Sequence, residues 1–186
     1  QGTPVAIGPA CTVLANWDGK DNLNSVGGHI WREFWRQLGA ANLPIFSTAF
    51  DAGNPVTTPA NLNTLSSEVR DAFARAILRL NNNSVSLNAT MGELQYDLDS
   101  DGTSRIPTFG GGGGTGSFTI IRGQLNTPTA AEGYGRNTFG NSYIQTVTWD
   151  DDGPIAEGFL TYSQSLDPTS PHFSDMTKRY SDKNWI

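Results

Sequence analysis

The chain has 186 residues, a formal net charge of −6 and a hydrophobic content of only 37%. This acidic balance excludes a basic face of the kind that binds nucleic acid, and no apolar run is long enough to cross a bilayer. The 21 glycines favour a protein rich in loops and β-structure, in which five Trp and nine Phe supply much of the buried apolar area.

The first 24 residues are predicted to form an irregular surface segment, because prolines and the turn-like run Trp17–Asp21 interrupt them. Cys11, the one cysteine of the chain, is expected to be a small buried apolar residue. The alternative is a disulfide to another chain or to a missing segment. The first residue, Gln1, is neither an initiator methionine nor part of a signal peptide, which indicates that the chain has been cut.

The first predicted helix covers residues 25–38, with Ser25 as its N-cap. Apolar side chains recur at every fourth position and two tryptophans widen the stripe, which is typical of a face that packs in a core. Arg32, Glu33 and Arg36 occupy the other side of this helix, and we expect them to be solvated.

The second predicted helix covers residues 62–80 and completes a helical part that extends over about residues 25–81. The loop between the two helices contains Ile45, Phe46 and Phe50, which we expect to be tucked beneath it. The second helix has one charged face and one apolar face, and the apolar residues are Leu62, Leu65, Val69, Phe73, Ala76, Ile77 and Leu80.

A β-rich part is predicted from about residue 93 to residue 163. The first two of its strands flank an Asp-Ser-Asp-Gly turn and form a hairpin. The last two pair across an acidic turn, so that Tyr143, Val147 and Trp149 share one face of the final hairpin. The predicted strands cover residues 93–96, 104–107, 117–122, 142–149 and 156–163.

A closing helix is predicted over about residues 171–182, with Ser170 or Ser174 as its cap. It carries Phe173, Met176 and Tyr180 on one side. Two helices, a meander of short strands and a closing helix form an α+β pattern, and the tight turns make most of the strand pairs antiparallel.

Two motifs of this β-rich part resemble ligand-binding motifs. Asp97–Gly102 matches the opening of an EF-hand calcium loop. The twelfth position of that loop is Thr108, however, which supplies no bidentate carboxylate, so a plain hairpin turn is favoured. Gly110–Gly114 are five consecutive glycines, but they lack the Lys of a phosphate loop and lead into a strand. We expect them to give the backbone freedom or a close approach to a neighbour.

The chain has two histidines, and neither has the neighbours of a zinc site. His29 lies at a helix start, and His172 lies near Ser170, Ser174 and Asp175, which are the residue types of a hydrolytic triad. A triad is defined by its geometry, and this local spacing has no mechanical meaning. We expect His172 to bond to its own turn, and we predict no catalytic residue and no metal ligand on this chain.

The stretch Gln164–Asp175 resembles the Gln-Ser-Gly-x-Pro-x-Ser-Pro-His-Tyr-x-Asp signature near the C-terminus of the penicillin acylase family. Leu166 stands where the signature has Gly, and Phe173 where it has Tyr. Further segments resemble the acyl-homoserine-lactone and aculeacin acylase branch of the family, so that the resemblance covers nearly the whole chain. These segments are Cys11–Gly19, His29–Trp35, Gly92–Tyr96 and Arg105–Pro107.

The resemblance implies part of an N-terminal-nucleophile hydrolase with a four-layer αββα sandwich, made as one exported precursor that cuts itself into a small and a large subunit. The nucleophile is the first Ser of the large subunit. Its own α-amino group is the general base, because a terminal amine has a pKa near neutrality. Residues 1–186 would form one segment, the C-terminal portion of the large subunit, downstream of the family's nucleophile, oxyanion Asn and calcium ligands.

The first hypothesis is therefore the C-terminal structural portion of a periplasmic or extracellular amidohydrolase that cleaves N-acyl substrates, either acyl-homoserine lactones or β-lactams. Such activities are linked to quorum quenching and antibiotic degradation. The chain would be no independent domain, would be inactive alone and would assemble with the remaining large-subunit segment and the small subunit. It would need no cofactor, and any family calcium would be bound outside it. The alternative is a free-standing secreted module that binds carbohydrate or calcium, and a third hypothesis is a self-contained hydrolase that uses His172.

Overall fold

The computed structural model describes residues 4–38, 45–123, 125, 133–137 and 139–186. It contains helices together with mostly short strands, which confirms the predicted mixed α+β class. The described helices are α1 (Gly8–Ala15), α2 (Gly28–Leu38), α3 (Ser67–Asn82), α4 (Met91–Leu94), the 3₁₀ helix η1 (Gly113–Thr115) and α5 (Asp175–Asp182).

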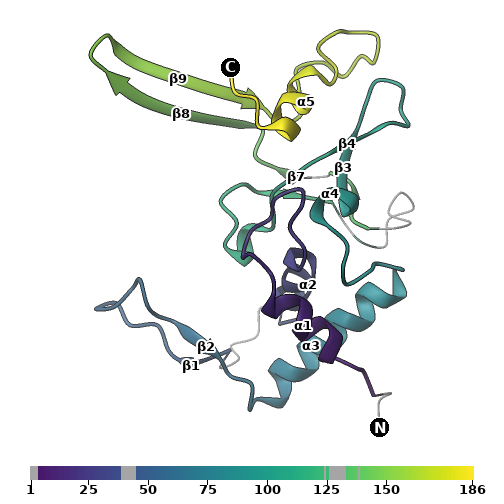
Figure 1. The fold of residues 1–186 in the computed structure, drawn as a ribbon, viewed down its shortest axis with the longest axis vertical. Helices are drawn as coiled ribbons and strands as arrows, with labels where there is room; N and C mark the ends of the chain where they lie inside the picture. The colour runs from purple at the N-terminus through teal and green to yellow at the C-terminus, as the bar shows by residue number, and fades with distance from the viewer. Residues whose placement is uncertain (1–3, 39–44, 124, 126–132, 138) are drawn as a thin grey trace.

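The strands are short except for the last two, which form a hairpin that extends from one end of the molecule (Figure 1). Most pairs are antiparallel, as predicted: β1 with β2, β3 with β4, β5 with β7, and β8 with β9. β3 also pairs with β6 in parallel, with Gln95 opposite Gly135. The strands are β1 (Phe46–Thr48), β2 (Ala60–Leu62), β3 (Gln95–Leu98), β4 (Arg105–Pro107), β5 (Ile121–Arg122), β6 (Gly135–Arg136), β7 (Phe139–Gly140), β8 (Tyr143–Asp150) and β9 (Gly153–Leu160).

Both predicted hairpins are confirmed, but Glu93 and Leu94 belong to α4 and not to the first strand, and the strand expected over residues 117–122 is reduced to β5. The cause lies in the glycines before it. Gly113–Thr115 form one turn of 3₁₀ helix, and Gly116 follows in the left-handed conformation with φ +89°. The backbone therefore turns before residue 117, Ile120 forms only an isolated bridge to Gly111, and the regular strand begins at Ile121.

At the helical end of the molecule, α2 packs against α3, as the apolar stripes predicted. The second helix starts later than predicted, at Ser67, because the side chain of Ser66 accepts a hydrogen bond from the Val69 amide and caps it. Leu62 belongs to β2, and Leu65 is 87% exposed, so the prediction was wrong for both. The buried residues of this interface are Phe34, Leu38, Val69, Ala72 and Ala76.

The first helix also starts later than predicted, at Gly28. Ser25 is not its cap. The Ser25 hydroxyl donates to Asp18 Oδ2 at 3.0 Å and accepts from the Asn22 amide at 3.3 Å, so that it closes the turn before the helix. Ser25 therefore lies close to the start of the helix, as predicted, but its side chain stabilises the preceding turn and not the helix.

The N-terminal segment is not irregular throughout, because Gly8–Ala15 form α1 with a proline in the first turn. Ala10 of this helix faces the protein core and is fully buried, whereas the next residue, Cys11, is exposed. The prediction of a buried Cys11 was therefore wrong. Phe50 is 62% exposed and was also predicted wrongly. It follows β1, which with β2 extends away from α2 and α3 (Figure 1), whereas Phe46 contacts Trp35.

The closing helix α5 covers the base of β9. Phe159 of β9 stacks on Trp185 at 4.1 Å between ring centroids and meets Tyr180 edge-on at 5.4 Å. Met176 and Tyr180 are buried, as predicted, but the helix begins at Asp175 rather than near residue 171. These aromatic contacts fix one end of the long hairpin to the body of the protein.

Candidate functional site

The stretch Gln164–Asp175 forms a polar corner between β9 and α5. The amides of Gln164 and Ser165 both donate to the carbonyl of His172, at 3.2 and 3.1 Å, and so close the loop on itself. Beside it, the hydroxyls of Ser163 and Thr177 lie 3.0 Å apart, and the Thr177 amide donates to Ser163 Oγ at 3.0 Å. The corner therefore ties the last strand to the last helix.

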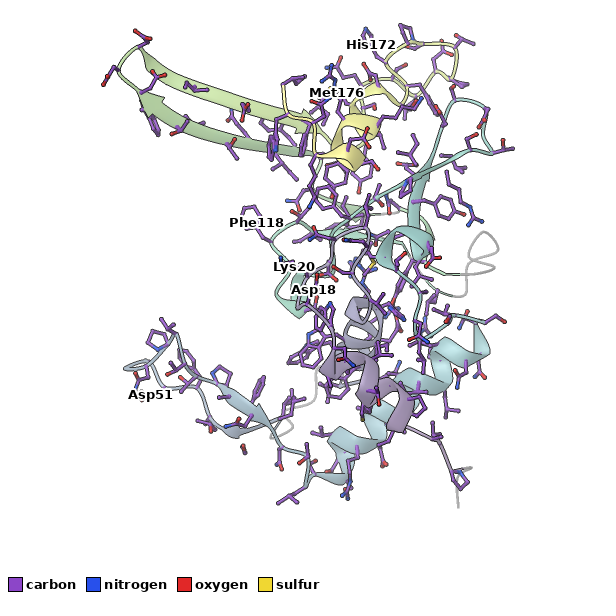
Figure 2. All side chains as sticks on the ribbon, in the orientation of Figure 1. Asp18, Lys20, Asp51, Phe118, His172 and Met176 are labelled. Carbon is purple, nitrogen blue, oxygen red and sulfur yellow. The ribbon has the colours of Figure 1, made fainter. Side chains whose placement is uncertain are left out.

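The corner brings His172 to a carboxylate but not to a serine nucleophile. His172 Nδ1 lies 2.9 Å from Asp175 Oδ2, and this contact lowers the pKa of Asp175. The hydroxyl of Ser170 accepts from the His172 amide at 3.1 Å, and the hydroxyl of Ser174 donates to Asp99 Oδ1 at 2.6 Å. Neither serine hydroxyl bonds to the imidazole, which lies on the outer side of the loop (Figure 2). This geometry is a turn that bonds to itself, as predicted, and not a triad.

The carboxylates of the acidic turn between β3 and β4 accept hydrogen bonds from other groups of the protein. Lys178 Nζ of α5 lies 2.7 Å from Asp99 Oδ2, and together with Ser174 it holds the pKa of Asp99 well below its usual range. Asp101 accepts from the amides of Thr103 and Ser104 and from the Ser104 hydroxyl, which lowers its pKa to about 2. The turn thus joins the hairpin to the closing helix.

Within the described residues, no group of three or more His, Cys, Asp or Glu side chains is placed to hold a metal ion. None of the helices in the described ranges combines the length and apolar character needed to cross a membrane.

The glycine run approaches its neighbours as closely as the sequence suggested. Gly110 has φ +110°, and a Cβ at that position would lie 2.7 Å from the carbonyl oxygen of Thr119. Its amide donates to the Asp21 carbonyl at 2.8 Å, and its own carbonyl accepts from Arg32 and Gln95. A residue with a side chain could not take this place without displacing backbone.

A buried polar layer, which the local sequence pattern did not predict, lies under the glycine run. Arg32 and Glu33, which were expected to be solvated, are 4% and 0% exposed. Glu33 Oε2 lies 2.8 Å from Arg79 Nε, and Glu33 Oε1 accepts from the Tyr134 hydroxyl at 3.1 Å. The Arg32 guanidinium lies over the Tyr134 ring, 4.4 Å from its centroid. The sequence shows only that Arg32 and Glu33 lie opposite an apolar stripe. Without knowledge of the tertiary contacts, that position predicts exposure to solvent and not burial.

His29 belongs to the same buried layer. Its Nε2 lies 3.1 Å from the carbonyl oxygen of Ser86, and burial lowers its pKa to about 4, so the imidazole is neutral at pH 7. Burial likewise raises the pKa of Tyr134 well above its usual value. These shifts follow from desolvation of groups that hold the core together.

Two open cavities are lined by aromatic residues. One, of about 540 Å³, lies between α1, α2 and α3, has an almost wholly apolar lining that includes Trp31 and Phe73, and has Cys11 at its margin. The other, of about 480 Å³, lies between the turn after α1, the glycine loop and the C-terminus, and includes Lys183 and Trp185. The second cavity also contains Ser117, whose hydroxyl donates to Asp21, and neither cavity has a histidine among its described lining residues.

The long hairpin leaves an apolar face uncovered. Side chains alternate along β8, so that Tyr143, Val147 and Trp149 lie on one face, as predicted, with exposed fractions of 55%, 44% and 71%. The partners opposite them in β9 are also apolar: Pro154, Ala156 and Leu160. A soluble chain normally covers a patch of this kind with another element.

The comparisons with known proteins cover the chain from end to end. A model of the family described as penicillin amidase matches residues 2–186. Aculeacin-A acylase of Actinoplanes utahensis is 35% identical over 186 residues, which are 100% of this chain and 22% of that protein. The acyl-homoserine lactone acylase PvdQ of Pseudomonas syringae pv. syringae (strain B728a) is 32% identical over 181 residues, which are 96% of this chain and 23% of that protein. The chain thus spans less than a quarter of the length of these relatives.

Proposed function

The chain belongs to the penicillin amidase family, and on this premise we propose that it is the C-terminal structural portion of an N-acyl amide hydrolase. The complete enzyme would act in the periplasm or outside the cell. Its substrates would be N-acyl compounds, first acyl-homoserine lactones and second β-lactams. The names of the relatives, an aculeacin-A acylase and acyl-homoserine lactone acylases, support this substrate class.

In this proposal the chemistry is carried by another segment. A Ser at the first position of the large subunit attacks the substrate amide, and its own α-amino group takes the hydroxyl proton. The corner at His172 supports the assignment, because no Ser–His hydrogen bond exists there. The present chain would complete the sandwich and would assemble with the rest of the large subunit and the small subunit. It would need no cofactor of its own, and any calcium ion would be bound outside it.

The observation that carries the proposal is the uncovered apolar face of the β8–β9 hairpin. A two-stranded hairpin alone is marginally stable in water and needs further strands or a packed face. This one has two strands of eight residues. Its face with Tyr143, Val147 and Trp149 is apolar except for Gln145, and Ile155 on the opposite face is also 44% exposed. The occupant we propose is the remaining polypeptide of the acylase, because the relatives are more than four times as long as the part that this chain matches.

A pair of matched variants tests the docking. Trp149→Lys places a charge on the apolar face, and Thr148→Lys places the same charge at the next position, on the opposite face. When the chain is co-expressed with the rest of the polypeptide, Trp149→Lys should abolish co-purification, and Thr148→Lys should retain it. Equal retention of both variants would contradict the proposal. A free-standing binding module predicts the opposite result, a folded monomer that needs no second polypeptide.

The activity is tested on the complete assembly. Acyl-homoserine lactones of increasing chain length and penicillin G should be hydrolysed by the assembled protein and not by this chain alone. Intact mass and denaturing gels of the active material should show a larger polypeptide together with this sequence. Hydrolysis by material that contains only this chain would overturn the proposal.

A further inference from the structure

The glycine run and α2 enclose a pocket whose described lining residues offer cations and hydrogen-bond donors but no carboxylate. It has a volume of about 290 Å³, and its lining includes Arg32, Trp35, Arg36, Arg122 and Gly112–Gly114. Arg32 and Arg36 of α2 lie there together with the exposed Arg122, which stacks on the Phe139 ring, although the chain as a whole has a net charge of −6. Like charges held close together repel one another, and an anion placed between Arg32 and Arg36 would remove this repulsion.

Arg32 shows the need for such an anion most directly. It is 4% exposed, and the groups that its guanidinium bonds are neutral: Gln95 Oε1 at 2.9 Å and the Gly110 carbonyl at 3.0 Å. Its Nε is buried and has no hydrogen-bond partner among the described residues. The adjacent carboxylate of Glu33 is held by Arg79 at 2.8 Å. A buried cation with an unbonded N–H group destabilises the folded state unless an anion pairs with it.

Further donors of the same pocket are unused. Trp35 Nε1 is buried and makes no hydrogen bond to a described residue. The amides of Gly112–Gly114 likewise have no acceptor in the described part of the chain. Arg36 forms a long ion pair with Glu33 Oε1 at 3.8 Å, and its side chain is 43% exposed, which leaves its other donors free to face the pocket. The glycines carry no side chain that would cover their N–H groups, and a Cβ on Gly114 would meet nothing within 4 Å. Successive backbone N–H groups of this kind bind anions.

We infer that this pocket binds an oxyanion, either a carboxylate or a phosphate. Guanidinium groups match both in shape and charge, and backbone amides supply the remaining donors. The volume suits a small charged group with a few waters, and it is at the lower limit of pockets that hold drug-sized ligands. The oxyanion has two sources, a carboxylate side chain of the remaining polypeptide or a free solute. The inference does not depend on the proposed acylase function, since it uses only donors and charges of this chain.

The test measures amide hydrogen exchange at Gly112–Gly114 in the complete polypeptide, purified in chloride buffer without oxyanions. For a free solute, inorganic phosphate should slow exchange at these amides about tenfold relative to sodium chloride of equal ionic strength. For a carboxylate of the protein, these amides should be protected without phosphate. In both cases Arg36→Met should raise their exchange rate about tenfold. Arg75→Met, which removes an exposed arginine from α3 outside the pocket, should leave the rate unchanged.

The exchange rates distinguish a solute site, an internal carboxylate and an empty pocket. Protection that depends on phosphate and on Arg36 identifies a solute site, and protection that depends on Arg36 alone identifies an internal carboxylate. Unprotected amides with and without phosphate would overturn the inference, as would protection that Arg36→Met leaves intact. Because wild-type exchange alone already distinguishes an empty pocket from a filled one, the test holds even if Arg36→Met does not fold.

Discussion

Replacing Tyr180 by Phe tests how the closing helix is fastened to the body of the protein. Tyr180 is fully buried, its hydroxyl donates to the Phe109 carbonyl at 2.6 Å, and its ring stacks on the Phe109 ring at 4.3 Å. Tyr180→Phe removes the hydroxyl and retains the ring, so that the packing on Phe109 and Phe159 persists. What is lost is one partly buried hydrogen bond, and a carbonyl is left without its donor.

The loss is worth about 1–2 kcal/mol, which makes the local opening of α5 about 5- to 30-fold more frequent. Native-state hydrogen exchange of the α5 amides in the complete protein measures this opening directly. Tyr162→Phe is the matched control, because Tyr162 packs against the same cluster as Tyr180 and its hydroxyl makes no hydrogen bond to a described residue. Equal exchange rates in Tyr180→Phe and the wild type would refute the idea that this hydrogen bond fastens the helix.

Three further substitutions test the N-cap of α3, the ion pair of Asp99 and the role of His172. Ser66→Ala should destabilise α3 by about 1 kcal/mol through loss of its N-cap, and Ser67→Ala should cost little, as thermal unfolding of the pair would show. Asp99 has a pKa depressed by Lys178, so its stabilising effect is complete above the unfolded pKa near 3.9 and is lost as the pH falls toward the folded pKa. Asp99→Asn should therefore flatten the acid dependence of the melting temperature, and an unchanged slope would contradict this. His172→Ala should leave turnover of the complete enzyme unchanged, and loss of turnover in a folded variant would revive a catalytic role.

Periodicity predicted those elements whose stability comes from one strong local pattern. The apolar stripes of α2 and α3 and the alternation in β8 and β9 all correspond to elements of the structure. One error lies where apolar residues continued a pattern to the N-terminal side of a helix start signal. Leu62 and Leu65 extend the stripe of α3 backward, but Ser66 caps the helix after them. The missed helix α1 carries its own signal, a proline in the first turn, which favours a helix start as well as a loop.

The buried polar layer could not be predicted, because its partners are distant in sequence. The Arg32 guanidinium meets the Gly110 carbonyl across 78 positions, and the Tyr134 hydroxyl meets Glu33 across 101. Local pattern assigns Arg32 and Glu33 to solvent, since an isolated helix has only water on its charged side. Only the fold of the glycine run over α2 turns that side inward.

The groups that looked catalytic in the sequence are those whose bonding capacity the structure already uses. Ser174 and Lys178 engage Asp99, and His172 engages Asp175. Unused capacity lies elsewhere, on the apolar face around Trp149 and among the donors around Arg32. An apolar face requires another packed surface, and a cluster of buried donors requires an anion. The first requirement supports our proposal that the chain is one part of an assembly, and the second can be met either by that assembly or by a free oxyanion, so the two experiments above test them separately.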